Sequence, residues 1–210
     1  MSTSTVTVEN TWDFSDDIAY KGEAIQGINE QVVRQISRDN EEPEWMLELR
    51  LEALRLYEAR PMPGWGPDLS NLDLQSIYYF RRPEGAGNNK SWDDVPDEIK
   101  NTFDKLGIPE AEKKALAGVG AQYDSETVYH SLKEEIAEQG VIFDDLSHAL
   151  KNPKTEAIIK KYFAKSIPLN DHKFSALHYA VWSGGTFLYV PKGVKVSEPL
   201  QSYFRMNVKK

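Results

Sequence analysis

The chain has 210 residues, 40% of them hydrophobic and 28% charged, a composition typical of globular proteins, and it contains no cysteine. The lack of cysteine excludes disulfides, a thiol nucleophile and any thiolate-held zinc or iron–sulfur centre built from this chain alone, so we expect no cofactor in it. No apolar run is long enough for a membrane span, and the first ten residues do not resemble a secretory signal, which favours a cytoplasmic location.

Charge is distributed unevenly along the chain. Residues 1–150 carry 14 Lys and Arg against 30 Asp and Glu, whereas residues 151–210 carry 11 against 3. A change of this size predicts a change of role near residue 150. Two interpretations stay open: a solvated acidic helical half, or a basic part that meets an anionic partner or ligand. The net charge of −8 argues against non-specific nucleic-acid binding, because such binding depends on neutralising phosphates.

Helical spacing follows a polar stretch at residues 1–26, which we expect to be loosely ordered. The first apolar stripe begins behind a cap at Asn29 or a turn at Gly27, and it consists of Ile28, Val32, Val33 and Ile36. Residues 45–59 have the strongest helical pattern in the chain, and Arg60 followed by proline ends it. The sequence therefore predicts two helices before residue 60.

Five more helices are predicted between residues 94 and 168. The first is capped by Asp94 and closed by Gly107, and its inner face consists of Ile99, Phe103 and Leu106. A short helix is expected at residues 109–116. Together they extend the mainly helical region beyond the middle of the chain.

The third of these helices is expected to be capped by Asp124 or Ser125 and to end at Gly140. Its inner face consists of Val128, Leu132 and Ile136. Asp144 and Asp145 form an N-cap pair for the fourth. The last helix is lined by Ile158, Ile159, Tyr162 and Phe163.

The pattern changes from helical to strand-like within residues 171–210. Helical steps persist through Phe174, Leu177 and Val181. Gly184 and Gly185 then break the pattern, and residues 186–190 are a β-branched and aromatic run typical of a strand. Residues 194–196 form a second short run, and residues 200–208 a third. The sequence therefore predicts short strands joined by tight turns.

Side chains of the third run alternate between two sides of the predicted strand. One side consists of Leu200, Ser202, Phe204, Met206 and Val208, and the other of Gln201, Tyr203, Arg205 and Asn207. Arg205 and Asn207 therefore point the same way. They are either part of an outward polar face, or a fixed guanidinium and an amide donor that face an anion, since arginine stays charged at cellular pH.

Other catalytic patterns are not supported by the sequence. The four histidines lack the spacing of a helical metal pair, so we expect no metal site. The phosphate-binding glycine motifs and the G-x-S-x-G nucleophile motif are missing, which gives no support to nucleotide hydrolysis or serine-type acyl transfer. We therefore expect a protein that is not an enzyme, with Arg205 and Asn207 as its candidate site.

Two long stretches, FSALHYAVWSGGTFLYVPKGV at residues 174–194 and PLQSYFRMN at residues 199–207, carry a resemblance to a known family. Shorter stretches upstream agree with it in order: GINE (27–30), EPEWML (42–47), FDKLGIP (103–109) and LAG (116–118). The chain resembles the SufB/SufD family, and within it SufB, the scaffold subunit of the SUF iron–sulfur cluster assembly machinery. EPEWML and FDKLGIP together favour SufB over its paralogue SufD.

This resemblance implies an α+β chain: a mainly helical domain at residues 27–165, followed at residues 166–210 by the first strands of a right-handed parallel β-helix. It implies SufD and the ATPase SufC as partners in a complex that builds the Fe-S cluster, with sulfur delivered by SufE or SufU from the desulfurase SufS. Arg205 and Asn207 match the family's YFR-x-N motif, whose arginine and asparagine lie on the sulfur path inside the β-helix. No membrane or nucleic-acid partner is expected.

Members of the SufB group are more than twice as long as this chain, so it resembles an N-terminal fragment that lacks the cysteine-bearing part. Alternative interpretations are a free-standing helical interaction module that uses residues 45–59 as its partner surface, or a truncated paralogue without function. A polysaccharide-cleaving β-helix is disfavoured, because it needs paired carboxylates on the strands and residues 151–210 hold only three acids.

Overall fold

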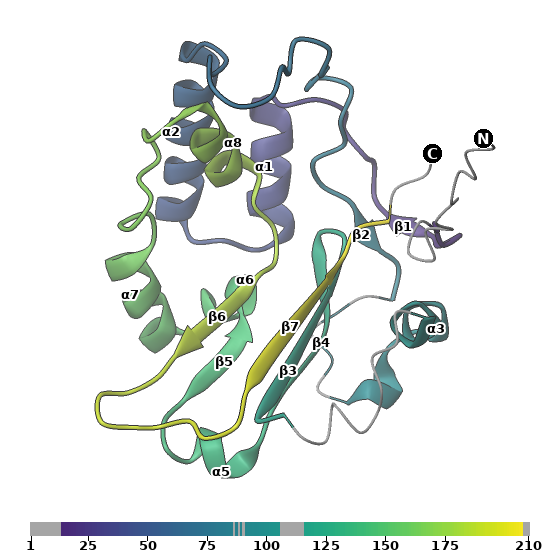
Figure 1. Ribbon diagram of the computed structural model, residues 1–210, viewed down its shortest axis with the longest axis vertical. Helices are drawn as coiled ribbons and strands as arrows, with labels where there is room; N and C mark the ends of the chain where they lie inside the picture. Colours follow the sequence, from purple (N-terminus) through teal and green to yellow (C-terminus); the bar gives the residue numbers. More distant parts are fainter. Residues whose placement is uncertain (1–13, 86, 88, 90, 106–115, 208–210) are drawn as a thin grey trace, which may run out of the picture.

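The computed structural model describes residues 14–85, 87, 89, 91–105 and 116–207. Helices α1, α2 and α8 gather at one end of the molecule and the sheets lie at the other (Figure 1). The elements are β1 (Tyr20–Lys21), α1 (Glu30–Asp39), α2 (Glu44–Ala59), β2 (Arg82–Pro83), the 3-10 helix η1 (Trp92–Asp94), α3 (Asp97–Lys105), β3 (Gly118–Tyr123), β4 (Glu126–Leu132), α5 (Glu134–Ala137), β5 (Ile142–Asp145), α6 (Leu146–Ala149), α7 (Pro153–Tyr162), α8 (Lys173–Val181), β6 (Thr186–Tyr189) and β7 (Leu200–Arg205).

Helices α1, α2 and α8 pack on one another and form the helical layer. Their shared core contains Val33, Ala53, Leu54, Tyr57, Ala176 and Ala180, all buried. The predicted cap is confirmed, because the Asn29 side chain accepts a hydrogen bond of 3.1 Å from the backbone N–H of Val32. The apolar stripe of each helix faces the other two. The apolar side of α2, which was a predicted partner surface, therefore packs against α1 and α8 of the same chain.

A buried ion pair holds α2 against the turn that precedes it. Arg50 donates from Nε and Nη2 to the carboxylate of Glu42 at 2.7 and 2.5 Å, and both side chains are fully buried. Its Nη1 donates to the carbonyl of Ala180 in α8 at 3.1 Å, and the guanidinium lies 4.4 Å from the centre of the Trp182 ring. The Arg50 guanidinium is therefore paired with a carboxylate, bonded to a carbonyl and stacked on an aromatic ring.

Strand β3 is the centre of a three-stranded sheet, with β4 antiparallel on one side and β7 parallel on the other. Tyr123 of β3 pairs with Glu126 of β4 and with Arg205 of β7. Glycine is needed at the start of β3, because a Cβ on Gly118 would lie only 2.8 Å from the carbonyl oxygen of Ser131. Figure 1 shows β7, the last strand of the chain, running alongside β3.

The helix predicted after Asp124 or Ser125 is wrong. These two residues form the turn of the β3–β4 hairpin, and Asp124 has a φ of 49°, a left-handed conformation that aspartate tolerates better than most residues. Val128 and Leu132 lie on β4, and only Ile136 lies in a helix, α5. The pattern misled because a spacing of four residues is even and fits one side of a strand as well as one face of a helix.

Other predictions between residues 94 and 118 are corrected in part. Ser91 caps η1 by accepting from the backbone of Asp93, so Asp94 ends a 3-10 turn and α3 begins at Asp97. Ile99 and Phe103 are buried as predicted. Leu106, Gly107, most of the helix predicted at residues 109–116, and Val208 lie outside the described residues.

The second sheet pairs β5 with β6 antiparallel. The predicted cap at its end is confirmed, because Asp145 accepts a 2.9 Å hydrogen bond from the backbone N–H of His148 and opens α6. Helix α7 follows where it was predicted, and the strand predicted at residues 186–190 is β6. The run at residues 194–196 is not a strand, although Val194 and Val196 pack against the cluster around Ala117.

The described residues therefore form a mixed α+β structure with small sheets, as predicted at the level of class. The β-helix and the domain limits at residues 26 and 165 stay predictions. Strands from both sides of residue 165 share hydrogen bonds in two sheets, β3 with β7 and β5 with β6. Among the described residues, no helix has both the length and the apolar character to cross a membrane.

Candidate functional site

One half-buried side of the chain at the end of β7 carries Arg205, the last residue of the strand, and Asn207, two residues beyond it. Phe204 and Met206, on the opposite side, are 61% and 73% exposed. Tyr203 packs against the buried cluster of α3 and the hairpin, and Arg205 and Asn207 continue the same side. The predicted alternation is seen from Tyr203 to Asn207, with an unexpected consequence: at this end of β7 the apolar side faces outward and the polar side faces protein.

Arg205 is held by the first described residue of the chain. Its guanidinium lies over the Phe14 ring, 4.4 Å from the ring centre, and its Nη2 donates to the carbonyl oxygen of Phe14. The Nε of Arg205 is buried and has no hydrogen-bond acceptor among the residues that the structure describes. One donor of a fixed cation is thus left over for another acceptor.

Asn207 makes a two-way contact with the backbone of Asp16. Its Oδ1 accepts from the Asp16 N–H and its Nδ2 donates to the Asp16 carbonyl, both at 2.9 Å. The Nδ2 also lies 3.1 Å from the hydroxyl of Tyr20, and the backbone N–H of Asn207 donates to Asp124 Oδ1 at 2.6 Å. The amide is therefore fixed in orientation by the segment that precedes β1.

The carboxylate of Asp124 lies at the centre of this polar group. It also accepts from the Tyr20 hydroxyl at 2.7 Å. Burial raises the pKa of Asp124, while the hydrogen bonds from Asn207 and Tyr20 and the charges of Arg81 and Arg205 act in the opposite direction. Burial, together with the bond to Asp124, raises the pKa of Tyr20 to about 12.

A second tyrosine, Tyr123, extends the polar group towards the same segment. Its hydroxyl donates to Asp16 Oδ2 at 2.6 Å. Burial first, and then the hydrogen bond to the Asp16 carboxylate, raises the pKa of Tyr123, so this hydroxyl stays protonated and remains a donor. Asp16 is therefore contacted through its backbone by Asn207 and through its side chain by Tyr123.

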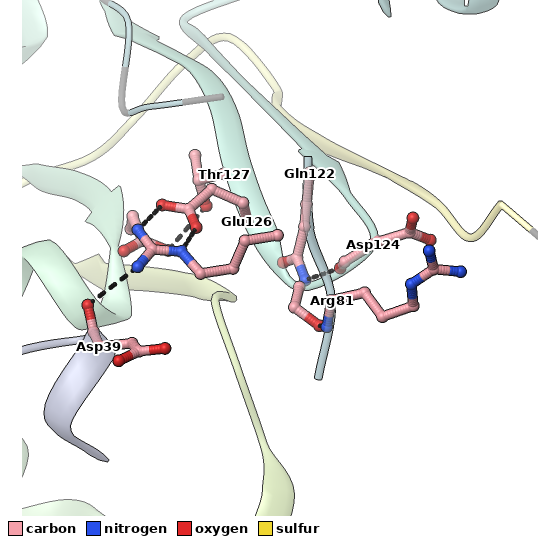
Figure 2. Close-up of polar contacts among 9 residues, drawn as sticks. Asp39, Arg81, Gln122, Asp124, Glu126 and Thr127 are labelled. Carbon is pink, nitrogen blue, oxygen red and sulfur yellow. Dashed lines mark hydrogen bonds and ion pairs between the residues drawn. The ribbon is translucent and has the colours of Figure 1, made fainter. Parts of the chain in front are cut away.

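Arg81 is a candidate site residue that the sequence analysis did not identify. Figure 2 shows it beside the β3–β4 turn with its guanidinium towards Asp124, and its backbone N–H donates to the Ser125 hydroxyl at 3.0 Å. The guanidinium lies 3.7 Å from the centre of the Tyr20 ring. Its Nε is buried and, like that of Arg205, has no hydrogen-bond acceptor among the described residues. No sequence motif marks this position.

The next residue, Arg82, has a different role. Its Nε and Nη2 donate to the two carboxylate oxygens of Glu126, and its Nη1 donates to the carbonyl of Asp39 at the end of α1 at 3.1 Å. This bidentate pair ties β2 to β4 and α1. Arg82 is therefore a structural residue whose donors are used, whereas the buried Nε atoms of Arg81 and Arg205 have no acceptor among the described residues.

The two arginines open onto a groove of about 980 Å³. Its apolar part comes from residues 76–79 and from the end of α8, and its polar part from the ends of β3 and β7. The lining includes Arg81, Asp124, His178, Arg205 and Asn207. Burial and the nearby charge of Arg50 lower the pKa of His178, so it is neutral at neutral pH.

This arrangement suits an anion rather than a metal. Two cations and an amide lie at a partly desolvated end of the groove, where electrostatic attraction is stronger than in water. Among the described residues, no group of three or more histidines and carboxylates is arranged to hold a metal ion. The same polar group contains two carboxylates, Asp124 and Asp16, which lower the net positive charge that a ligand would meet.

The family model for the SufBD protein N-terminal region matches residues 34–202. The chain belongs to the SufBD family. Its curated relatives agree: an iron–sulfur cluster assembly SufBD family protein of Staphylococcus haemolyticus (strain JCSC1435) is 56% identical over 182 residues, which are 87% of this chain and 38% of that protein. A protein of the same description from Staphylococcus aureus (strain USA300) is 53% identical over 194 residues, covering 92% of this chain and 41% of the relative.

The matched region contains all the groove-lining residues up to Gly185. The remaining ones, including Arg205 and Asn207, lie within five residues of its end. The chain spans about two-fifths of the length of the curated relatives it matches. The family membership predicted from EPEWML, FDKLGIP and PLQSYFRMN is thereby confirmed.

Proposed function

We propose that this chain is the N-terminal part of a SufB-type scaffold of iron–sulfur cluster assembly, in which Arg205 and Asn207 line the route of sulfur towards the cluster. Family membership supports the process. The observation that carries the assignment is local: Arg205 at the end of β7 and Asn207 just beyond it lie on one half-buried side, at a groove, and the buried Nε of Arg205 has no acceptor among the described residues.

The chemistry fits sulfur in its anionic forms. A persulfide or hydrosulfide carries negative charge near neutral pH, and a guanidinium attracts it without itself losing a proton. The Asn207 amide supplies a donor whose direction is already set by its neighbours. Holding such an anion in a partly desolvated groove limits its reaction with water or oxidants on the way. In this role Arg205 and Asn207 bind and orient the sulfur, and no bond is made or broken by them.

The cluster itself is formed elsewhere. Iron–sulfur clusters are held mainly by cysteine thiolates, and this chain has none. We therefore assign the chain no cofactor and no catalytic residue, and we place its partners, SufD and SufC, and the sulfur donor SufE or SufU with SufS, outside it. Anaerobic reconstitution of the 210-residue chain should yield no stoichiometric iron and sulfide.

The test is made in a full-length SufBD family protein into which this chain is exchanged for the matching region. Replacing Arg205→Lys keeps the charge but removes the planar guanidinium, and we expect cluster formation to fall by about tenfold or more, because a compact ammonium cannot reproduce the directed donors. Arg55→Lys, on the exposed face of α2, is the matched control and should leave the rate unchanged. A normal rate in the Arg205→Lys protein would refute the proposed sulfur route.

A further inference from the structure

The residues that hold Arg205 and Asn207 belong to one short segment, residues 14–20, which we call the strap. It is extended, and its side chains alternate: Ser15, Asp17 and Ala19 are exposed, and the residues between them turn inward. Phe14 contacts Arg205, Asp16 contacts Asn207, and Tyr20 contacts both Asn207 and Asp124. The strap therefore covers the same two side chains that the proposed function needs.

The strap is attached mainly by polar contacts, and its apolar Ile18 packs half-buried against the cluster of α3 and the hairpin. None of its residues is buried to the degree of the helical core. Beyond the contacts with β7, its attachments include the Tyr123–Asp16 and Tyr20–Asp124 hydrogen bonds, a hydrogen bond of 2.8 Å from the Glu84 N–H to the Ala19 carbonyl, and the two-residue pairing of β1 with β2. Segments with few buried apolar contacts and short ladders open at low free-energy cost.

The strap also imitates what an anionic ligand would offer. The Phe14 carbonyl is the acceptor for Arg205, and the Asp16 carboxylate is the acceptor for the Tyr123 hydroxyl. It still leaves the buried Nε of Arg205 without an acceptor among the described residues, and the Nε of Arg81 likewise. A ligand with several acceptor atoms could therefore satisfy these donors more completely than the strap does.

We infer that the strap is a displaceable cover, and that a small sulfur-containing anion competes with it for Arg205 and Asn207. In the closed state the strap holds both side chains in place through Phe14, Asp16 and Tyr20. In the open state Arg205, Asn207 and Arg81 face the anion together. This inference rests on the proposed function for the identity of the anion, but the opening of the strap itself does not.

The first experiment measures opening in the 210-residue chain without any ligand. Phenylglyoxal modifies accessible guanidinium groups, and mass spectrometry locates the product. Asp16→Ala and Tyr123→Phe each remove the carboxylate–hydroxyl hydrogen bond, so modification of Arg205 should accelerate by about tenfold, the effect of losing one hydrogen bond to a charged group. Ser15→Ala, on the exposed side of the strap, is the matched control and should not change the rate.

Arg55 is an internal standard in the same samples, because its partner Glu52 lies on the same helix, α2, away from the strap. Its modification rate should stay the same in all variants, and amide protection in α2 and α8 should show that the fold is intact. Equal Arg205 rates in wild type, Asp16→Ala and Tyr123→Phe would show that the strap is no cover, and would leave the sulfur-route proposal untouched.

The second experiment tests competition in the wild-type chain with sodium thiosulfate, and with sodium chloride at equal ionic strength as the control. Thiosulfate should speed hydrogen exchange at the Asp16 amide, which loses its acceptor on Asn207, and should protect Arg205 from phenylglyoxal. If thiosulfate changes neither measurement relative to chloride, the competition is refuted. If the strap opens in the first experiment but Arg205→Lys assembles clusters normally, the cover is real and the sulfur route is wrong.

Discussion

Two arginines of this chain, Arg50 and Arg205, illustrate two different uses of a partly or fully buried cation. Arg50 is enclosed in the helical layer with every direction satisfied by Glu42, Ala180 and Trp182. Arg205 is half-buried at the edge of a groove, held by one carbonyl and one ring, with a donor unused among the described residues. The first charge stabilises an arrangement of helices; the second is placed where something else can reach it.

The largest expected change in the free energy of unfolding follows from replacing Arg50. Arg50→Ala leaves the buried Glu42 carboxylate unpaired, and we expect the free energy of unfolding to fall by about 3–5 kcal/mol, as when one partner of a buried ion pair is removed. Urea denaturation followed by circular dichroism measures this. Arg55→Ala, whose exposed pair with Glu52 lies on the same helix, is the control and should be close to wild type. Similar losses in both variants would contradict the contrast.

A second prediction concerns the sheet that carries Arg205. Gly118→Ala places a Cβ 2.8 Å from the Ser131 carbonyl and 2.9 Å from Leu200, between β4 and β7. The strands must move apart, and the free energy of unfolding should fall by about 1–3 kcal/mol. Gly64→Ala is the control, since nothing lies within 4 Å of the added carbon. An unchanged stability for Gly118→Ala would mean that β7 does not depend on close approach to β3.

The smallest effect is expected in the pH dependence of stability, through Asp124. Its raised pKa means that the folded protein binds this proton more tightly than the unfolded chain does, so the free energy of unfolding falls as pH rises from the ordinary value of 3.8 through the raised one. Asp124→Asn removes that contribution and keeps an acceptor for the Asn207 N–H. Unfolding measured between about pH 4 and about pH 7 should show a shallower decline in the variant than in wild type. Parallel curves would refute the assignment.

The helical layer was largely predictable from the sequence because its information is local. The spacing of apolar residues and the cap at Asn29 gave α1, α2 and α8 within a few residues of their observed ends. The cap at Asp145 was likewise found from adjacent carboxylates. In each case the residues that decide the structure lie within one or two helical turns of one another.

The hairpin and most of the site could not be found in this way. Val128, Leu132 and Ile136 have a spacing that fits two structures, and the choice between them is made by β7, which pairs with β3 from far along the chain. Arg205 and Asn207 were found because a strand alternates, and their family motif gave them a role. Arg81 and residues 14–20 reach them only through tertiary contacts, which no local pattern records.

The parallel pairing of β3 with β7 also sets an order for folding. On a ribosome the β3–β4 hairpin emerges long before Leu200, so one edge of β3 stays bare while α6, α7 and α8 are synthesised. Closing that edge requires a long loop of intervening chain, which makes β7 the expected last strand to dock. Since β7 carries Arg205, the candidate site would be completed only after β7 has docked on β3.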